Sequence, residues 1–363
     1  MSRRDIHYWK CDRPAGFHGI RCNRDATVLE ADLRRCLALQ LRGAAFELQH
    51  IASQGNHLTW IAKTETDEYF VRVEDGPEGD DYLSVESALL ERLRRLQIPT
   101  PRLIACDASR EQAPFAWQAL ERIDAPDLQY WHTRGRLDVD RVAVAVGEAV
   151  ARWQQVPVSG FGPFDTRELA SHGTLQGYHG SYAGYFFLNL DRHLGLLCDR
   201  EFLSRSRAIE VECAFERHET LLKLERGCLV HKDLAFWNIL GTPTTIDAYI
   251  DWDDAIAGDS MDDISLIACF HSPEVVARAV EGYSRVRPLP AQYATRLYLH
   301  LLRNMIVKAV IRVAAGYFDR GPDFFLIGAG SSGESLRQQT YEKIDFALRG
   351  LQQQDECIWR NLS

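Results

Sequence analysis

The chain has no long apolar run. No stretch of the ~18 residues that mark a membrane-spanning helix is both uncharged and apolar throughout. The sequence begins MSRRDIH, which has no apolar region of the kind found in secretory signals. We therefore expect a cytoplasmic protein that makes no membrane contact.

Cysteine pairs at metal-binding or disulfide spacing are also missing. The 9 cysteines are scattered, odd in number and include no C-x-x-C pair. A zinc site or a disulfide framework would require such paired spacing. We therefore expect reduced thiols, most of which serve as small core hydrophobes.

The chain has no excess of basic charge. It carries 42 Lys and Arg against 51 Asp and Glu, a net charge of -9. Proteins that bind nucleic acid usually present a basic face, so we expect no nucleic-acid partner. A negative field attracts cations, which slightly favours a cationic small molecule as a ligand.

The length and apolar content of the chain predict two lobes. Its 363 residues, 46% of them hydrophobic, can build two cores. Residues 1–45 form an extension with a helix, 46–122 read as mainly strands, and 123–363 read as mainly helices. Within the last part, a helical insertion is expected at about 165–226.

Two short motifs carry the candidate chemistry. Residues 229–240, LVHKDLAFWNIL, fit the H-x-D-L-x-x-x-N pattern of a kinase catalytic loop, and AYIDWD follows at 248–253. Such a loop needs a carboxylate that accepts the proton of an attacking hydroxyl. It also needs an amide oxygen and a second carboxylate that hold Mg²⁺. Asp233, Asn238 and Asp251 supply these groups in that order.

The second motif continues in a way that resembles a known family. Residues 250–264, IDWDDAIAGDSMDDI, are similar to the I-D-W-E-x-A-x-x-G-D-P-x-x-D-L of aminoglycoside phosphotransferases and related small-molecule kinases. Lys232 stands where that family has the glycine of H-G-D, and Ser260 where proline is usual. The D-F-G and A-P-E motifs of protein kinases are absent from the corresponding positions.

The resemblance covers about residues 46–264 and implies an α+β, protein-kinase-like fold with two lobes. A small antiparallel-sheet N-lobe at 46–122 would bind the nucleotide. A larger helical C-lobe at 123–363 would carry the catalytic loop and the substrate site. The first forty residues lie outside the resemblance, and their role is open.

The N-lobe offers candidate nucleotide-binding residues. Strand-like segments at 46–51 and 57–63 flank a turn in which Ser53, Gly55 and Asn56 could fold over phosphates, although the turn lacks a G-x-G-x-x-G repeat. The resemblance places Arg72, on the third strand, against the phosphates and pairs it with Glu86 on the next helix. A pair at a cleft edge contributes little to stability, so removing Arg72 is expected to affect ATP binding more than folding.

The strand at 115–123 resembles the hinge between the two lobes. Its end, Glu121 to Ile123, would offer a backbone carbonyl and an N–H group to the edge of adenine. The remaining polar motif residues have structural roles in this interpretation. His231 braces the catalytic loop, while Asp259 and Asp263 accept backbone N–H groups near the following helix.

The resemblance implies that the γ-phosphoryl group of ATP or GTP is transferred, with Mg²⁺, to a hydroxyl of a small molecule. The acceptor could be an aminoglycoside, an aminocyclitol, a sugar or an amino alcohol. Asp253, Asp254 and Asp262 lie near the catalytic loop in sequence and favour an amine-bearing acceptor. It would bind between the catalytic loop, the helical insertion and the C-terminal helices of a monomer or homodimer.

Two other interpretations remain open. A pseudokinase that binds nucleotide as a regulatory module would have the same fold, but such proteins usually lack one of Asp233, Asn238 and Asp251. A metal-dependent glycosyltransferase could use Asp251 and Asp253 as a D-x-D pair. That alternative leaves the pattern from His231 to Asn238 without a role.

Overall fold

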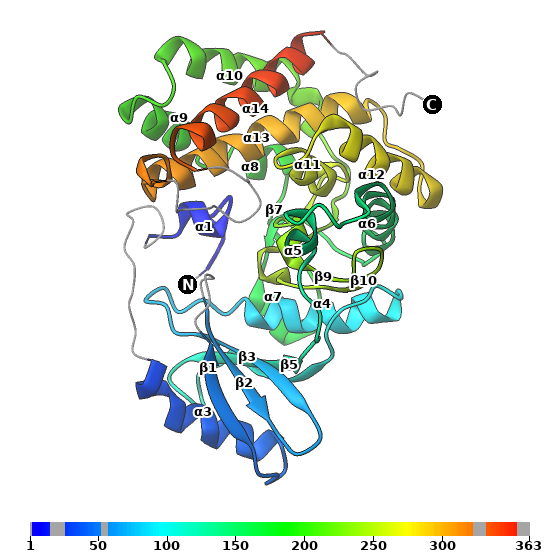
Figure 1. Cartoon of the computed structure of the whole chain (residues 1–363). Coiled ribbons are helices and arrows are strands. Elements are labelled where there is room, and N and C mark those ends of the chain that lie inside the picture. Colours follow the sequence, from blue (N-terminus) through cyan, green and yellow to red (C-terminus); the bar gives the residue numbers. More distant parts are fainter. Residues whose placement is uncertain (1, 15–25, 52–56, 322–331, 354–363) are drawn as a thin grey trace.

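The protein has two lobes, a smaller one built on a sheet and a larger one built from helices (Figure 1). The computed structural model describes residues 2–14, 26–51, 57–321 and 332–353. The predicted turn residues Ser53, Gly55 and Asn56 lie outside this part of the chain. The α+β, kinase-like two-lobed fold expected from the sequence is confirmed.

The N-lobe is an antiparallel sheet of order β1-β2-β3-β5-β4, covered on one side by helix α3. Apolar residues recur at helical spacing along α3, and Leu33 packs in one core with Trp60 and Val71 of the sheet. Helix α4 contacts β4 and β5, the two strands that follow it in the chain. The N-lobe elements are α3 (Ala26–Gln40), β1 (Glu47–Ile51), β2 (Leu58–Lys63), β3 (Glu68–Glu74), α4 (Leu83–Arg95), β4 (Leu103–Asp107) and β5 (Ala116–Glu121).

The first part of the C-lobe holds α6, which ends next to the catalytic loop, and the predicted helical insertion. Its elements are α5 (Leu128–His132), α6 (Val139–Trp153), β6 (Phe161–Phe164), α7 (Thr166–His172), β7 (Gly177–His179), α8 (Tyr182–Phe186), α9 (Leu190–Asp199), α10 (Arg205–Arg217) and η1 (Glu219–Leu222). The aromatic side chains of α8 are buried in the helical core.

The second part of the C-lobe carries both motifs and the C-terminal helices. Its elements are β8 (Cys228–Val230), η2 (Phe236–Asn238), β9 (Ile239–Gly241), β10 (Ile246–Tyr249), η3 (Trp252–Asp254), β11 (Ile256–Gly258), α11 (Asp262–Ala268), α12 (Pro273–Val286), α13 (Tyr293–Ala314), η4 (Tyr317–Asp319) and α14 (Gly333–Gln353). Strand β11 pairs with β8, and the β9–β10 hairpin separates the two motifs.

Helices α6 and α12 approach each other closely at two glycines. A Cβ atom on Gly147 would lie 1.9 Å from the carbonyl oxygen of Ala279, and one on Gly282 would lie 2.0 Å from that of Val144. Larger side chains would therefore force the helices apart. This contact fixes the position of α6, whose last residue, Trp153, donates to the Asp263 carboxylate of α11 at 3.1 Å.

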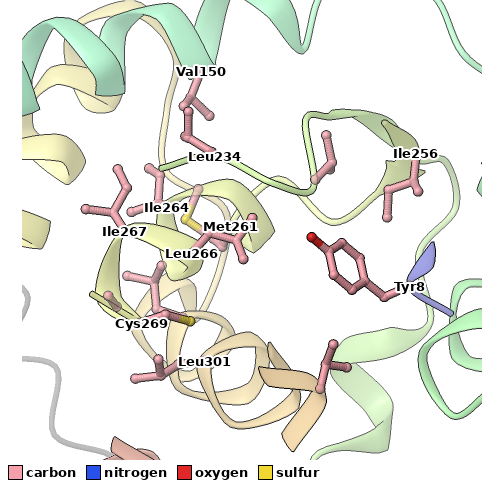
Figure 2. Close-up of a cluster of buried hydrophobic side chains, with 14 of the residues drawn as sticks. Tyr8, Val150, Leu234, Ile256, Met261, Ile264, Leu266, Ile267, Cys269 and Leu301 are labelled. Carbon is pink, nitrogen blue, oxygen red and sulfur yellow. The ribbon is translucent and has the colours of Figure 1, made fainter. Parts of the chain in front are cut away.

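The N-terminal extension is divided between the two lobes. Helix α3 belongs to the N-lobe core, whereas α1 (Trp9–Asp12) lies away from it, beside α13 (Figure 1). Tyr8 and Cys11 are buried in the core of the helical lobe. Figure 2 shows the Tyr8 ring extending into this core, with Ile256 and Met261 among the surrounding side chains.

Among the described residues, no helix combines the length and apolar character that would be needed to cross a membrane. The seven cysteines in this part of the chain are free thiols. Five of the seven lie in a hydrophobic core or pack against one, as was expected for most of the thiols: Cys11, Cys36, Cys228, Cys269 and Cys198.

Candidate active site

The catalytic loop follows β8 and is braced by buried side chains. His231 is fully buried, its Nε2 lies 2.9 Å from the carbonyl oxygen of Ile250, and its Nδ1 accepts the backbone N–H of Asp233. Asp263 accepts the backbone N–H groups of His231 and Lys232, at 2.9 and 3.1 Å. Both residues therefore hold the loop, as expected for His231. Asp263 stabilises the loop itself rather than its own helix.

Lys232 occupies a backbone position that favours glycine. Its φ of 70° lies in the left-handed region, which explains why a glycine is usual between the histidine and the aspartate. The side chain compensates by donating to Asp262 at 2.8 Å and to Asn304 at 3.1 Å. This buried contact ties the loop to α11 and α13 and could not be read from the motif.

Asp233 is the single carboxylate of the loop, and both of its oxygens accept hydrogen bonds. Its Oδ1 accepts the hydroxyl of Tyr8 at 2.9 Å, and its Oδ2 accepts the ammonium of Lys10 at 2.6 Å and the amide of Asn238 at 3.0 Å. Burial alone would raise the pKa of Asp233, but the Lys10 ammonium reverses this effect and the pKa is lowered. Asp233 is therefore an anion at neutral pH.

Asn238 and Asp251 present oxygen ligands that suit Mg²⁺. The side-chain N–H₂ of Asn238 donates to the carbonyl and to the carboxylate of Asp233, so its Oδ1 points elsewhere. The Asp251 carboxylate is partly exposed, at 29%, on a residue with a φ of 68°. Lys10 Nζ lies 3.7 Å from Asp251, so a positive charge already sits where these carboxylates converge. Amide and carboxylate oxygens are the donor set that Mg²⁺ requires.

Arg72 and Glu86 form the expected ion pair, with Arg72 Nη1 2.6 Å from Glu86 Oε2. Arg72 Nη2 also lies 3.1 Å from Asp251, and Glu86 Oε1 accepts the backbone N–H of Trp252. The pair thus joins the N-lobe sheet to the second motif. Burial raises the pKa of Glu86, and the Arg72 guanidinium opposes that rise.

The expectation that this pair contributes little to stability is wrong, because both partners are buried. Arg72 is 5% exposed and Glu86 is 1% exposed. Removing one partner leaves the other charge buried without compensation, which is strongly destabilising. The argument for exposed pairs does not apply here.

Replacing Arg72 by methionine is expected to lower the free energy of unfolding by about 3 kcal/mol. It should also raise the KM for ATP by roughly ten- to hundredfold, because a charge-assisted contact to phosphate is lost. Urea unfolding and nucleotide titration measure the two effects. Arg95→Met, on the exposed face of α4, is the matched control. Unchanged ATP affinity in a folded Arg72→Met variant would show that Arg72 does not contact the phosphates.

Asp253, Asp254 and Asp262 do not form an exposed acidic surface. Each of them is buried and paired with a cation. Their negative charge therefore does not favour an amine-bearing acceptor, contrary to the expectation from the sequence. The pairs are Asp253 with Arg72, at 3.6 Å; Asp254 with Arg3, at 3.0 Å, and with Lys10, at 3.6 Å; and Asp262 with Lys232, at 2.8 Å.

Asp259 has the structural role that was expected. Its carboxylate accepts the backbone N–H of Met261, pairs with Arg296 and lies 3.5 Å from His300. Burial alone would raise its pKa, but His300 and Arg296 lower the pKa to about 2. Asp259 therefore stabilises the fold above the ordinary carboxyl range, and this contribution is lost as the pH falls from about 4 towards 2.

Asp259→Asn is expected to lower the free energy of unfolding at neutral pH by roughly 2 kcal/mol. The difference from the parent should shrink as the pH is lowered below about 4, because the Asp259 carboxyl of the unfolded chain then takes up a proton while the native carboxylate is still ionised. Urea titrations over a pH series test this, with Asp247→Asn on the exposed side of β10 as the control. An equal loss in both variants would contradict the buried ion pair.

The hinge residues lie where the sequence placed them. Glu121 ends β5. Its backbone N–H donates to the carbonyl oxygen of Arg102, and its carboxylate accepts the backbone N–H of Arg102. Ile123 follows the strand and is half-buried. Their contact with adenine, like the role of the turn at 52–56, stays a prediction.

The N-terminal segment 2–14 supplies site residues that the sequence analysis missed. Arg3, Tyr8 and Lys10 reach Asp254 and Asp233, residues more than two hundred positions away. The segment shows no helical or strand period, so no pattern pointed to it. Its concentration of basic and aromatic side chains in an acidic chain, RRDIHYWKCDR, was the available signal.

The two-lobed fold, the braced loop and the convergence of Asp233, Asn238, Asp251 and Arg72 define a phosphotransferase of the kinase-like class. The model of one family, described as the phosphotransferase enzyme family, matches residues 47–295. The chain therefore belongs to the phosphotransferase enzyme family. None of the curated proteins compared with the chain matches it.

Solved structures share the fold at low sequence identity. Aminoglycoside phosphotransferase APH(4)-Ia is 17% identical, with a TM-score of 0.60, over 87% of this chain and 98% of that chain. A thermostable mutant of the same enzyme, solved as a ternary complex with ADP and hygromycin B, is 16% identical, with a TM-score of 0.58, over 86% and 98%. A candidate fructosamine-3-kinase from Haemophilus somnus 129PT is 15% identical, with a TM-score of 0.58, over 88% and 98%.

Proposed function

We propose that the protein transfers the γ-phosphoryl group of ATP to a hydroxyl group of a small molecule, in a reaction that depends on Mg²⁺. The observation that carries this proposal is the convergence of Asp233, Asn238 and Asp251 with the Arg72–Glu86 pair. The complex of APH(4)-Ia with ADP and hygromycin B supports a nucleotide and a hydroxylated small molecule as the two substrates.

Each residue has a separate task in this reaction. Asp233, an anion held by the loop, orients the acceptor hydroxyl and takes its proton. Asn238 and Asp251 would hold Mg²⁺, which neutralises charge on the phosphates when bound. Arg72, fixed by Glu86, steadies the same phosphates from the N-lobe. Catalysis then consists mainly of positioning and charge stabilisation.

A cavity near the catalytic loop is a candidate for the acceptor site. Its volume is about 630 Å³, and residues at the start of α12 and along α13 and α14 line it. Phe270, in its wall, makes a ring contact with Trp237 of the loop at 4.7 Å. The wall includes Arg312 and Lys343. No residue of the insertion at about 165–226 lines this cavity in the described part of the chain, so the C-terminal helices are the stronger candidates for selecting the acceptor.

The acceptor class is decided by measuring ADP release with a panel of hydroxylated compounds. The panel should pair aminoglycosides and amino alcohols with neutral sugars and cyclitols of similar size, and include fructosamines. We expect acceptor-dependent ADP release with at least one compound. Nucleotide binding without any turnover across the panel would favour a regulatory pseudokinase instead.

A further inference from the structure

The hydroxyl of Tyr8 occupies the place where a phosphoryl acceptor should sit. It donates to Oδ1 of Asp233 at 2.9 Å, while Oδ2 is engaged by Lys10 and Asn238. The carboxylate that is proposed to receive the acceptor proton therefore already holds the proton of a phenol. An external acceptor must displace Tyr8, unless Tyr8 is itself an acceptor.

Arg3 anchors the segment that carries Tyr8, on the N-terminal side of that residue. This guanidinium is 2% exposed and forms a two-pronged contact with Asp80, at 2.9 and 2.6 Å. It also donates to Asp254 at 3.0 Å and lies between the rings of Trp9 and Tyr82. Burying an arginine is costly unless its partners are well placed, so this is a specific docking contact.

A second set of contacts anchors the segment on the other side of Tyr8. The Asp12 carboxylate accepts the backbone N–H groups of His7 and Tyr8, and lies 2.6 Å from the ring nitrogen of His193. The hydroxyl of Tyr185 donates to the carbonyl of His7. Tyr8 is thus fixed from both directions, with its ring in the C-lobe core (Figure 2).

The cluster of Cys11, Asp12 and His193 is a weaker candidate for a new site than Tyr8, although three atoms that could bind a metal ion lie close together there. Arg303 donates to Nδ1 of His193 at 3.0 Å, which leaves Nε2 to carry a proton and donate it to Asp12. The cluster is therefore a closed hydrogen-bond network that positions the segment.

Lys10 completes the arrangement around Tyr8. Its ammonium contacts Asp233 at 2.6 Å and lies 3.7 and 3.6 Å from Asp251 and Asp254. A cation between the proton acceptor and the proposed metal ligand would attract the negative γ-phosphate of a nucleotide. The segment therefore brings both a hydroxyl and a positive charge to the loop.

We propose that Tyr8 is an internal acceptor and that the protein phosphorylates its own Tyr8. The phenol oxygen forms a bond to the γ-phosphorus of a nucleoside triphosphate, and the bond from that phosphorus to the bridging oxygen breaks. The bonding electrons leave with the nucleoside diphosphate, and the phenol proton passes to Asp233. The product is a phosphate monoester on Tyr8. The inference rests on the proposed function, because the same base and donor are used.

The test incubates the full chain with Mg²⁺ and ATP, or GTP, and no external acceptor. Intact-mass measurement should show the gain of a single phosphoryl group, and fragmentation should place it on Tyr8. The fraction modified over time should not depend on protein concentration, because the acceptor lies in the same chain. These measurements on the unchanged chain decide the matter even if a variant does not fold.

Three variants sharpen the result. Tyr8→Phe keeps the ring and removes only the hydroxyl, so the modification should be lost. Asp233→Asn should lose it too while still binding nucleotide. Tyr341→Phe, which alters a more exposed tyrosine on α14, is the control and should be modified like the parent.

Two results would overturn the inference while sparing the proposed function. One is nucleotide binding or turnover while Tyr8 stays unmodified. In that case the Tyr8 hydroxyl only competes with the external acceptor for Asp233. The other is modification at another residue, or at a rate that rises with protein concentration. If neither ATP nor GTP binds, the proposed function fails and the inference fails with it.

Discussion

Asp233→Asn is expected to reduce turnover by about 10²–10⁴-fold while nucleotide affinity changes little, because the residue acts on the acceptor proton and not on the nucleotide. Asparagine is the appropriate replacement, since it keeps the size of the side chain and can accept the hydroxyl of Tyr8. Lys10 would retain Asp251 and Asp254 as neighbours, so the segment should stay in place. Turnover is measured with the acceptor that the panel identifies.

The control for this prediction is Asp247→Asn, which removes an exposed carboxylate from β10 without approaching the loop. It should keep the parental rate. If Asp233→Asn retains a near-normal kcat with a true acceptor, Asp233 does not belong to the mechanism. A parallel loss of nucleotide affinity would point to a damaged loop instead.

Asp251→Ala is expected to abolish the gain in nucleotide affinity that Mg²⁺ provides. Asn238→Ala should weaken that gain by roughly tenfold or more, because one of the few oxygen ligands is lost. Nucleotide titrations with and without Mg²⁺ separate a metal effect from a direct contact. Asp247→Asn, on β10 four residues before Asp251, again serves as the control.

Binding of Mg-ATP by Asp251→Ala at the parental affinity would place the metal elsewhere. The alternative in which Asp251 and Asp253 act as a D-x-D metal site would then be tested by replacing Asp253. The structure disfavours Asp253 as a metal ligand, because Asp253 is buried whereas the Asp251 carboxylate is 29% exposed.

Much of the fold was predictable because local patterns encode it. Strand-like sequence predicted β3 and helical spacing predicted α4, while the resemblance to the family predicted that Arg72 and Glu86 on these elements form a pair. The loop from His231 to Asn238 was predictable because its spacing is tied to the chemistry that it can perform.

Contacts between distant parts of the chain were not predictable. Tyr8 and Lys10 reach Asp233 across 225 and 223 residues, and nothing periodic in the sequence marks such a pairing. Burial was the second obstacle. The stability of the Arg72–Glu86 pair was misjudged because a sequence does not show whether a cleft-edge pair is exposed.

Sequence proximity also misled the electrostatic argument. Asp253 and Asp254 are adjacent in the chain, yet one faces Arg72 and the other faces Arg3 and Lys10. The 3-10 turn of η3 directs neighbouring side chains to different partners. A local run of acidic residues therefore did not create an acidic cleft.

The central claim is that this chain moves a phosphoryl group from ATP to a hydroxyl under the control of Asp233. The most direct test supplies ATP labelled in its γ-phosphoryl group, together with Mg²⁺ and the acceptor, and follows where the label goes. The proposed mechanism predicts one labelled phosphate ester for each ADP formed by the parent protein, and none from Asp233→Asn. Label that appears only in inorganic phosphate, or an ester formed equally well by Asp233→Asn, would contradict it.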